Sequence, residues 1–109
     1  MIGPIFALPP ELDFGKCFVR QHGQTEFAVL YNPWWNNGTA LISGITVLGN
    51  DFILDSRDTT CGSKLPTGDI CAIAIQFNPT AGGQRQGKLV IQDNALGTPQ
   101  VVILDGSGR

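Results

Sequence analysis

The sequence contains few of the residue types on which catalytic, nucleic-acid-binding and membrane-spanning proteins depend. Its 109 residues include one histidine, one tyrosine and three cysteines, and only 15% of them are charged. A basic nucleic-acid-binding surface is not expected, because the formal net charge is −2. No apolar run approaches the ~18 residues that a membrane helix needs, so we expect no membrane insertion. The start of the chain also lacks the basic segment and apolar run of a signal peptide.

Glycine and proline are plentiful instead, and they divide the chain into short apolar runs. There are 14 glycines and 7 prolines, and no window of about 11 residues has helical periodicity without one of them. Many runs alternate between apolar and polar residues, which predicts strands. We therefore expect an all-β fold, an immunoglobulin-like β-sandwich of seven to eight antiparallel strands, although periodicity alone does not distinguish it from a small barrel. The strands are expected at residues 12–15, 25–31, 41–47, 52–54, 71–77, 88–93 and 101–104.

Several short motifs follow one another in a fixed order over residues 9–108. They are L-D-F-G at Leu12, L-x-S-x-I-x-V-x-G at Leu41, F-x-P-T-x-x-G at Phe77, L-x-I-x-D-N-A at Leu89 and L-x-G-x-G at Leu104. This set resembles the immunoglobulin-like repeats of bacterial choice-of-anchor D surface proteins. Those repeats are similar to abnormal-spindle/Hydin (ASH) domains. The ASH domains in turn belong to the wider group of seven-stranded sandwiches that includes the major sperm proteins and the pilus chaperones. The resemblance implies a structural or binding module, with no catalytic residues or cofactor to transfer.

The cysteines bear on the compartment in which the protein works. Cys61 and Cys71 flank a segment with turn residues, a spacing that suits a disulfide but also allows two reduced thiols. The resemblance favours the disulfide, because related repeats have this pair, and a structural disulfide implies the periplasm, the cell surface or secretion. Cys17 is left over, and a buried thiol is expected there rather than an intermolecular bond. No zinc site is expected, because no C-x-x-C motif or histidine pair is present.

The remaining candidates for chemistry have simpler interpretations. His22, the single histidine, lies in a polar turn without the G-x-S-x-G motif of a hydrolase, so we expect no catalytic role for it. Asp51, Asp55, Asp58 and Asp69 lack the spacing of a calcium loop, and a solvated polar segment is expected. The sequence therefore predicts no enzyme, no metal and no cofactor.

The loop at residues 32–38 is the unusual feature of the chain. The related repeats have a tight N-x-G turn at this place, whereas here the loop reads N-P-W-W-N-N-G. Trp34, Trp35, Asn36 and Asn37 are the candidate binding residues, because tryptophan is enriched at interaction sites. Since neighbouring side chains of an extended segment point in opposite directions, we expect one indole to be buried and the other exposed.

These observations predict a non-catalytic structural or protein–protein interaction module of a larger secreted or surface protein. We expect residues 1–8 to be a lead-in or linker segment and residues 9–109 to form one domain. The expected partners are neighbouring repeats and an unidentified protein or glycan. One alternative is a carbohydrate-binding module that uses Trp34 and Trp35, and another is a cytoskeleton- or cilium-associated ASH-type domain, against which a disulfide would argue.

Overall fold

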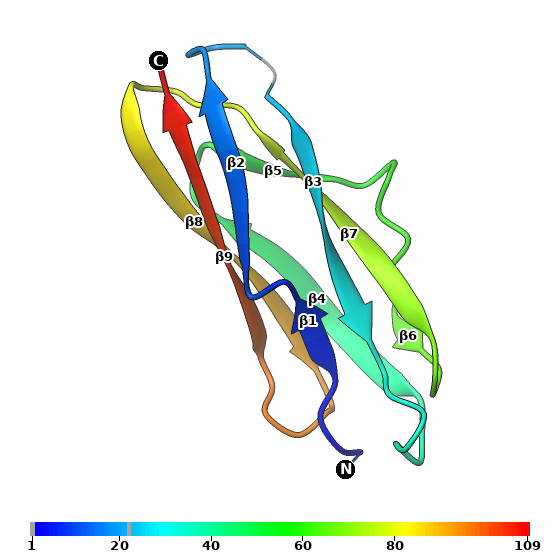
Figure 1. Cartoon of the computed structure of the whole chain (residues 1–109). Coiled ribbons are helices and arrows are strands. Elements are labelled where there is room, and N and C mark those ends of the chain that lie inside the picture. Colours follow the sequence, from blue (N-terminus) through cyan, green and yellow to red (C-terminus); the bar gives the residue numbers. More distant parts are fainter. Residues whose placement is uncertain (1, 22) are drawn as a thin grey trace.

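Two β-sheets stacked face to face make up the structure (Figure 1). It is a computed structural model that describes residues 2–21 and 23–109, and these residues form nine strands. Among them is no helix that is long and apolar enough to cross a membrane. The strands are β1 (Phe6–Leu8), β2 (Glu11–Cys17), β3 (Thr25–Tyr31), β4 (Ala40–Leu48), β5 (Phe52–Asp55), β6 (Lys64–Leu65), β7 (Ile70–Phe77), β8 (Gly83–Asp93) and β9 (Gln100–Gly108).

The sheets have the strand orders β1-β3-β7-β5 and β2-β9-β8-β4-β6. This confirms the expected all-β sandwich, with nine strands in the described residues instead of seven to eight. Neighbouring strands are antiparallel except β2 and β9, which run parallel. The expectation of a purely antiparallel fold was therefore wrong at this pair. The short strand β6 lies between Cys61 and Cys71, in the segment whose turn residues gave no strand pattern.

Residues 5–8 belong to the sandwich, whereas the sequence predicted a lead-in or linker at residues 1–8. Strand β1 pairs with β3, and the side chain of Ile5 is fully buried in the core. The chain then crosses at Pro9 and Pro10 to the other sheet, where β2 pairs with β9. Three prolines interrupt the apolar pattern of this segment, and this is why its strand could not be recognised in the sequence.

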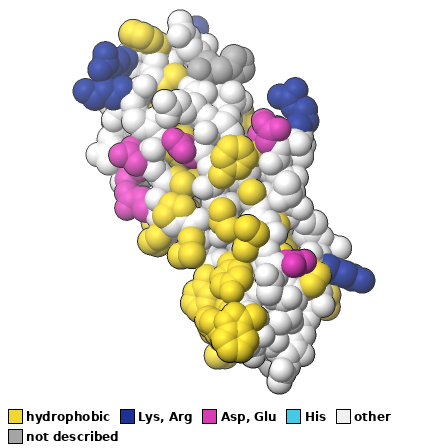
Figure 2. All heavy atoms as spheres, turned by 45° about the vertical axis from the view of Figure 1, so that its right-hand side comes forward, with side chains coloured by type: hydrophobic (Ala, Val, Ile, Leu, Met, Phe, Trp, Pro, Cys, Tyr) yellow, Lys and Arg dark blue, Asp and Glu magenta, His cyan; other side chains and the backbone are white. Residues whose placement is uncertain are grey.

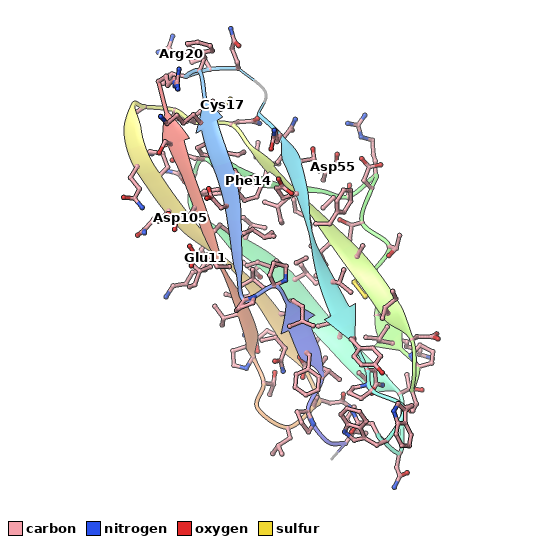
Figure 3. The ribbon with its side chains drawn as sticks, viewed as in Figure 1. Glu11, Phe14, Cys17, Arg20, Asp55 and Asp105 are labelled. Carbon is pink, nitrogen blue, oxygen red and sulfur yellow. A yellow bond between two sulfur atoms is a disulfide. The ribbon has the colours of Figure 1, made fainter. Side chains whose placement is uncertain are left out.

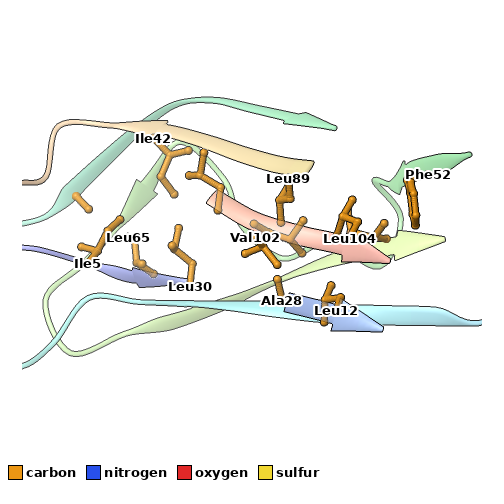
Figure 4. Packing of buried hydrophobic residues seen from close by; sticks show 14 of the residues in the cluster. Ile5, Leu12, Ala28, Leu30, Ile42, Phe52, Leu65, Leu89, Val102 and Leu104 are labelled. Atoms are coloured by element: carbon orange, nitrogen blue, oxygen red, sulfur yellow. The ribbon is translucent and has the colours of Figure 1, made fainter. Parts of the chain in front are cut away.

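The core lies between the two sheets (Figure 4). Three phenylalanines meet at one end of it, with ring centroids 5.0–5.9 Å apart: Phe14, Phe52 and Phe77. Two glycines of the facing sheet make room for these rings. A Cβ atom on Gly106 would lie 2.6–2.9 Å from ring atoms of Phe77, and one on Gly87 would lie 2.8 Å from Phe52. All three phenylalanines are buried.

A disulfide holds the edge of the four-stranded sheet. Cys61 is bonded to Cys71 of β7, the pair expected from the sequence. Beside it, the hydroxyl of Thr60 accepts a hydrogen bond from the amide of Ala72 at 2.8 Å, and the amide of Thr60 donates to the Ala72 carbonyl at 2.8 Å. The segment after β5 thus continues along β7 and satisfies backbone groups that would otherwise be exposed at the edge.

Candidate functional site

The two tryptophans form the tip of a tight turn, and both are exposed. The amide of Asn36 donates a hydrogen bond to the carbonyl of Pro33 at 3.0 Å, which places Trp34 and Trp35 at the two central positions of a β-turn. Trp34 is 74% exposed and Trp35 is 55% exposed. Their rings meet edge to face with centroids 5.7 Å apart. The expectation that one indole would be buried was wrong, because it assumed an extended segment and the segment is a turn.

Buried amides hold this tryptophan turn (residues 33–36) in place. Asn32 is fully buried, and its Nδ2 donates to the carbonyls of Gly38 and Leu65 at 3.0 and 2.9 Å. Asn36 is also buried, and its Nδ2 donates to Asn32 Oδ1 at 2.8 Å and to the Pro4 carbonyl at 3.0 Å. Asn36, one of the candidate binding residues of the sequence, therefore anchors the turn from the buried side. Asn37 is exposed beside the turn.

Apolar side chains cover the outward side of the four-stranded sheet. We call this surface the outer apolar face, and its members are Phe6, Leu8, Phe27, Val29, Tyr31, Ile53 and Ile70.

The register of the strands brings the outer apolar face up to the tryptophan turn. Tyr31 is paired with Phe6 on one side and with Ile70 on the other, and this row ends the face. The turn starts two residues after Tyr31. Figure 2 shows hydrophobic side chains as a band that extends to one end of the molecule. An apolar surface of this extent is typical of an interaction site.

The outward side of the other sheet is charged by comparison. Glu11 and Asp13 of β2, Lys88 of β8 and Asp105 of β9 lie there, and Figure 3 shows Glu11 and Asp105 next to each other. The pKa of Glu11 is raised because it shares a hydrogen bond with Asp105 and is repelled by that carboxylate. A hydrogen bond from Gln84 at 3.1 Å lowers the pKa of Asp105. This side is therefore polar, and the two sides of the sandwich differ in chemistry.

The carboxylates considered as a calcium loop do not converge. Asp51 is buried and accepts hydrogen bonds from the Thr80 hydroxyl and from Arg85 Nε, at 2.6 and 2.5 Å. Asp55 is paired with Arg57 at 3.5 Å. In the part of the chain that the structure describes, no group of three or more His, Cys, Asp or Glu side chains could hold a metal ion.

His22, expected to have no catalytic role, lies outside the described residues. Cys17 has a free, partly buried thiol, which packs against the core and lies 3.5 Å from the carbonyl of Phe18. The thiol is thus less buried than expected.

The sequence pointed to the tryptophan loop but not to the outer apolar face. A signal for it was present, because residues 25–31 are apolar on both sides of the strand, with Phe27, Val29 and Tyr31 on one side and Ala28 and Leu30 on the other. A strand that faces water on one side normally alternates with polar residues. Two-sided apolar patterns also occur in strands that are buried on both sides, so the pattern alone did not indicate a surface.

Comparisons with solved structures agree with the fold. The chain is similar to a Porphyromonas gingivalis W83 protein of unknown function, with a TM-score of 0.78, 11% identity and coverage of 96% of this chain and 46% of that chain. It is also similar to the secreted serine protease VesC from Vibrio cholerae, with a TM-score of 0.66, 18% identity and coverage of 88% and 21%. The ASH/PapD-like domain 7 of human CEP192 has a TM-score of 0.68, 13% identity and coverage of 96% and 84%.

The chain thus spans less than half of the length of the first two of these proteins. No curated protein matches its sequence. A family model does match, and it covers residues 4–107, which includes β1. The chain belongs to the HYDIN/CFA65/VesB-like family of immunoglobulin-like domains.

Proposed function

We propose that this chain is a non-catalytic module of a larger secreted or surface protein, and that it binds a protein partner through the outer apolar face and the tryptophan turn. The observation that supports this most is the exposure of both indoles at the end of an apolar sheet face. Exposed tryptophans cost free energy in solution, and they supply most of the binding energy where a partner covers them.

The disulfide supports a location outside the cytoplasm. A bond between Cys61 and Cys71 persists in oxidising compartments and is rare in the cytosol. VesC, one of the structural relatives, is described as a secreted protease in which the matching region is 21% of the chain. Both observations support a domain that is carried by a longer secreted protein, and they argue against the cytoskeletal alternative.

The shape of the domain suits a role between other parts of a protein. The sandwich measures 47 × 24 × 19 Å. Its termini lie at opposite ends of the long dimension (Figure 1). A segment before the domain and one after it would therefore be held apart by the length of the sandwich, as in a spacer, while the outer apolar face is left accessible from the side.

The carbohydrate-binding alternative has one observation in its favour. A groove lined by Ile2, Gly3, Pro4, Trp35, Asn36 and Asn37 lies beside the turn. The two indoles, however, are inclined at 84° to each other and do not form a common flat platform for a sugar ring. Protein binding is therefore the function that we propose, and glycan binding is an outcome that the test can return.

The test compares the wild-type chain with a Trp34→Ala/Trp35→Ala variant. Both are immobilised and exposed to the extracellular protein fraction of the source organism and to a glycan array. We expect a protein that the wild type retains and the variant loses, and that binds the wild type by calorimetry after purification. Phe18→Ala is the matched control, because Phe18 is also an exposed aromatic but follows β2 at the other end of the sandwich. Glycan binding alone, or protein binding that the variant retains, would contradict the proposal.

A further inference from the structure

We infer that the partner of the outer apolar face is a second copy of this chain, in a two-fold symmetric dimer in which the two faces pack together and the tryptophan turns lie at opposite ends. This inference rests on the proposed function, because it needs the face to bind protein, and it names the partner. Three properties of the face support it: its area, its charge and its arrangement along the strands.

The exposed apolar area is what a stable dimer needs. Phe6, Phe27, Trp34 and Trp35 are 39–74% exposed. This corresponds to roughly 500 Å² of aromatic surface, and the exposed aliphatic side chains raise the total to roughly 700–800 Å². The largest apolar patch of a typical monomer is about 300–600 Å², whereas a stable interface buries about 800 Å² on each partner. The face and the tryptophan turn together are therefore larger than the apolar patch that a monomer usually exposes.

The charge of the face allows an identical copy to approach. Among the outward positions of β1, β3, β5 and β7, Asp55 is the one charged side chain, and Arg57 neutralises it at 3.5 Å. Like charges that face each other across an interface are strongly unfavourable. The carboxylates on the outward side of the other sheet would repel an identical surface, but here no such repulsion arises. Association through the four-stranded sheet is therefore favoured over association through the five-stranded sheet.

The order of side chains along the face makes it complementary to itself. The pair Val29–Ala72 lies midway between the row that contains Tyr31 and the row that contains Phe27. A two-fold axis can lie in the plane of the interface, perpendicular to the strands, and pass through Val29. This axis places Phe27 of one copy opposite Tyr31 of the other. The same axis places each tryptophan turn over the far end of the partner's face, where Ile53 lies. Leu8, Val29 and Ala72 form the central row, and two such faces would pack at about 10 Å, the usual spacing of packed sheets.

The test is sedimentation equilibrium of the purified chain over a range of concentrations, together with its intrinsic fluorescence. We expect a mass of twice 11.7 kDa that decreases to the monomer on dilution to about micromolar concentrations. Trp34 and Trp35 are the two tryptophans of the sequence, so emission reports directly on the turn. We expect the emission to shift to shorter wavelength as the dimer forms, with the same midpoint as the change in mass.

A pair of matched variants locates the interface. Ile70→Lys places a charge on the outer apolar face and should abolish both the dimer and the concentration-dependent shift. Leu48→Lys is the control, because Leu48 is a similarly exposed aliphatic residue of the other sheet. The control should leave both measurements unchanged. Because Ile70 is 65% exposed at the start of β7, its replacement should leave the monomer folded, as circular dichroism can verify.

Three results would overturn the dimer. They are a monomer at all concentrations, a dimer that Ile70→Lys leaves intact, and a dimer that survives dilution but dissociates in reductant, as bonding through Cys17 would produce. A monomeric chain that still bound a purified partner in a tryptophan-dependent way would contradict this inference alone and leave the proposed function standing. Loss of both kinds of binding would contradict both.

Discussion

Single residues in this sandwich show how closely the core and the turns are fitted. Asn32 makes hydrogen bonds through its side chain and its backbone while fully buried, and the tryptophan turn depends on it. Gly106 has no side chain because a phenylalanine ring occupies that space. A substitution at such a position should change the free energy of unfolding by an amount that its contacts predict, so these positions are good tests of the structure.

Gly106→Ala should destabilise the protein by about 1–3 kcal/mol, the usual cost of overpacking. The new Cβ would lie 2.6 Å from the Phe77 ring, and this ring is stacked on Phe52 at 5.0 Å, so it has little freedom to move. Denaturant unfolding measures the change. Gly62→Ala is the control, because nothing lies within 4 Å of a Cβ there. Combining Gly106→Ala with Phe77→Leu should cost less than the sum of the two changes, and strict additivity would contradict the packing.

Asp51→Asn should destabilise the protein by about 2 kcal/mol at neutral pH, since it leaves Arg85 without its charged acceptor. Burial opposes ionisation of Asp51, but the hydrogen bonds from Thr80 and Arg85 outweigh it, and the pKa lies below its usual value of 3.8. A carboxyl whose pKa is lower in the folded state stabilises the fold above the unfolded pKa, and this contribution is lost as pH decreases through the folded pKa. Unfolding at a series of pH values should therefore show the two proteins converging below about pH 4. A difference that stays constant down to pH 2 would contradict the assignment.

At the scale of the elements, the sequence predicted the strands in which apolar and polar residues alternate. It did not predict the strand segments that form only because they pair with a neighbouring strand. Strand β3 lies at the predicted residues because its pattern is long and uninterrupted. Strands β8 and β9 extend well beyond the predicted ends, through Gln84 to Gln86 and through Asp105 to Gly108. These residues are polar or glycine and have no strand pattern of their own. Backbone pairing between the two strands forms this extension, and a single sequence does not reveal which segments pair.

The same reasoning applies to the candidate site. The tryptophans could be selected from composition, and the disulfide from spacing together with the family resemblance. The burial of Asn36 depends on contacts with the carbonyls of Gly3 and Pro4, which come from a segment more than thirty positions earlier. The outer apolar face is assembled from four strands. Both features are properties of the pairing order, so local pattern could not predict them.

Removal of the disulfide should destabilise the sheet edge. Cys61 and Cys71 are separated by 10 positions, and closing a loop of this length stabilises the fold by roughly 2–3 kcal/mol. We expect Cys61→Ala/Cys71→Ala to lower the free energy of unfolding by about this amount, and reductant to have the same effect on the wild type. The double variant should not respond to reductant, and Cys17→Ala should leave the response of the wild type unchanged. A wild type that is indifferent to reductant would contradict the stabilising role.

For the whole molecule, the decisive feature is that its two outward surfaces differ. One sheet presents carboxylates and lysine to water, whereas the other presents the outer apolar face and ends in the tryptophan turn. Strand β1 contributes Phe6 and Leu8 to that face, and the carbonyls of the preceding residues hold Asn36. Residues 4–8 thus contribute to the core and to the outer apolar face, and they also hold the tryptophan turn.

Deletion of residues 1–8 should therefore destabilise the entire sandwich. Ile5 is 1% exposed, and burial of such a side chain stabilises the fold by about 1.5–3 kcal/mol, to which the loss of the pairing between β1 and β3 is added. We expect a loss of at least ~3 kcal/mol in denaturant unfolding. Tryptophan emission should change as well, because the turn loses the carbonyl acceptors of Gly3 and Pro4.

Two point substitutions separate the core contribution of this segment from its surface contribution. Ile5→Ala should cost about 2–5 kcal/mol, as for other buried aliphatic residues, and Leu8→Ala, at a position that is half exposed, should cost less than about 1 kcal/mol. In sedimentation equilibrium, Leu8→Ala should weaken the dimer more than Ile5→Ala does, since Leu8 lies on the outer apolar face and Ile5 does not. A truncated chain that unfolds at the same denaturant concentration as the full chain would show that the domain begins after residue 8. The fold would then consist of the two sheets without β1, and the outer apolar face would lose one of its edges.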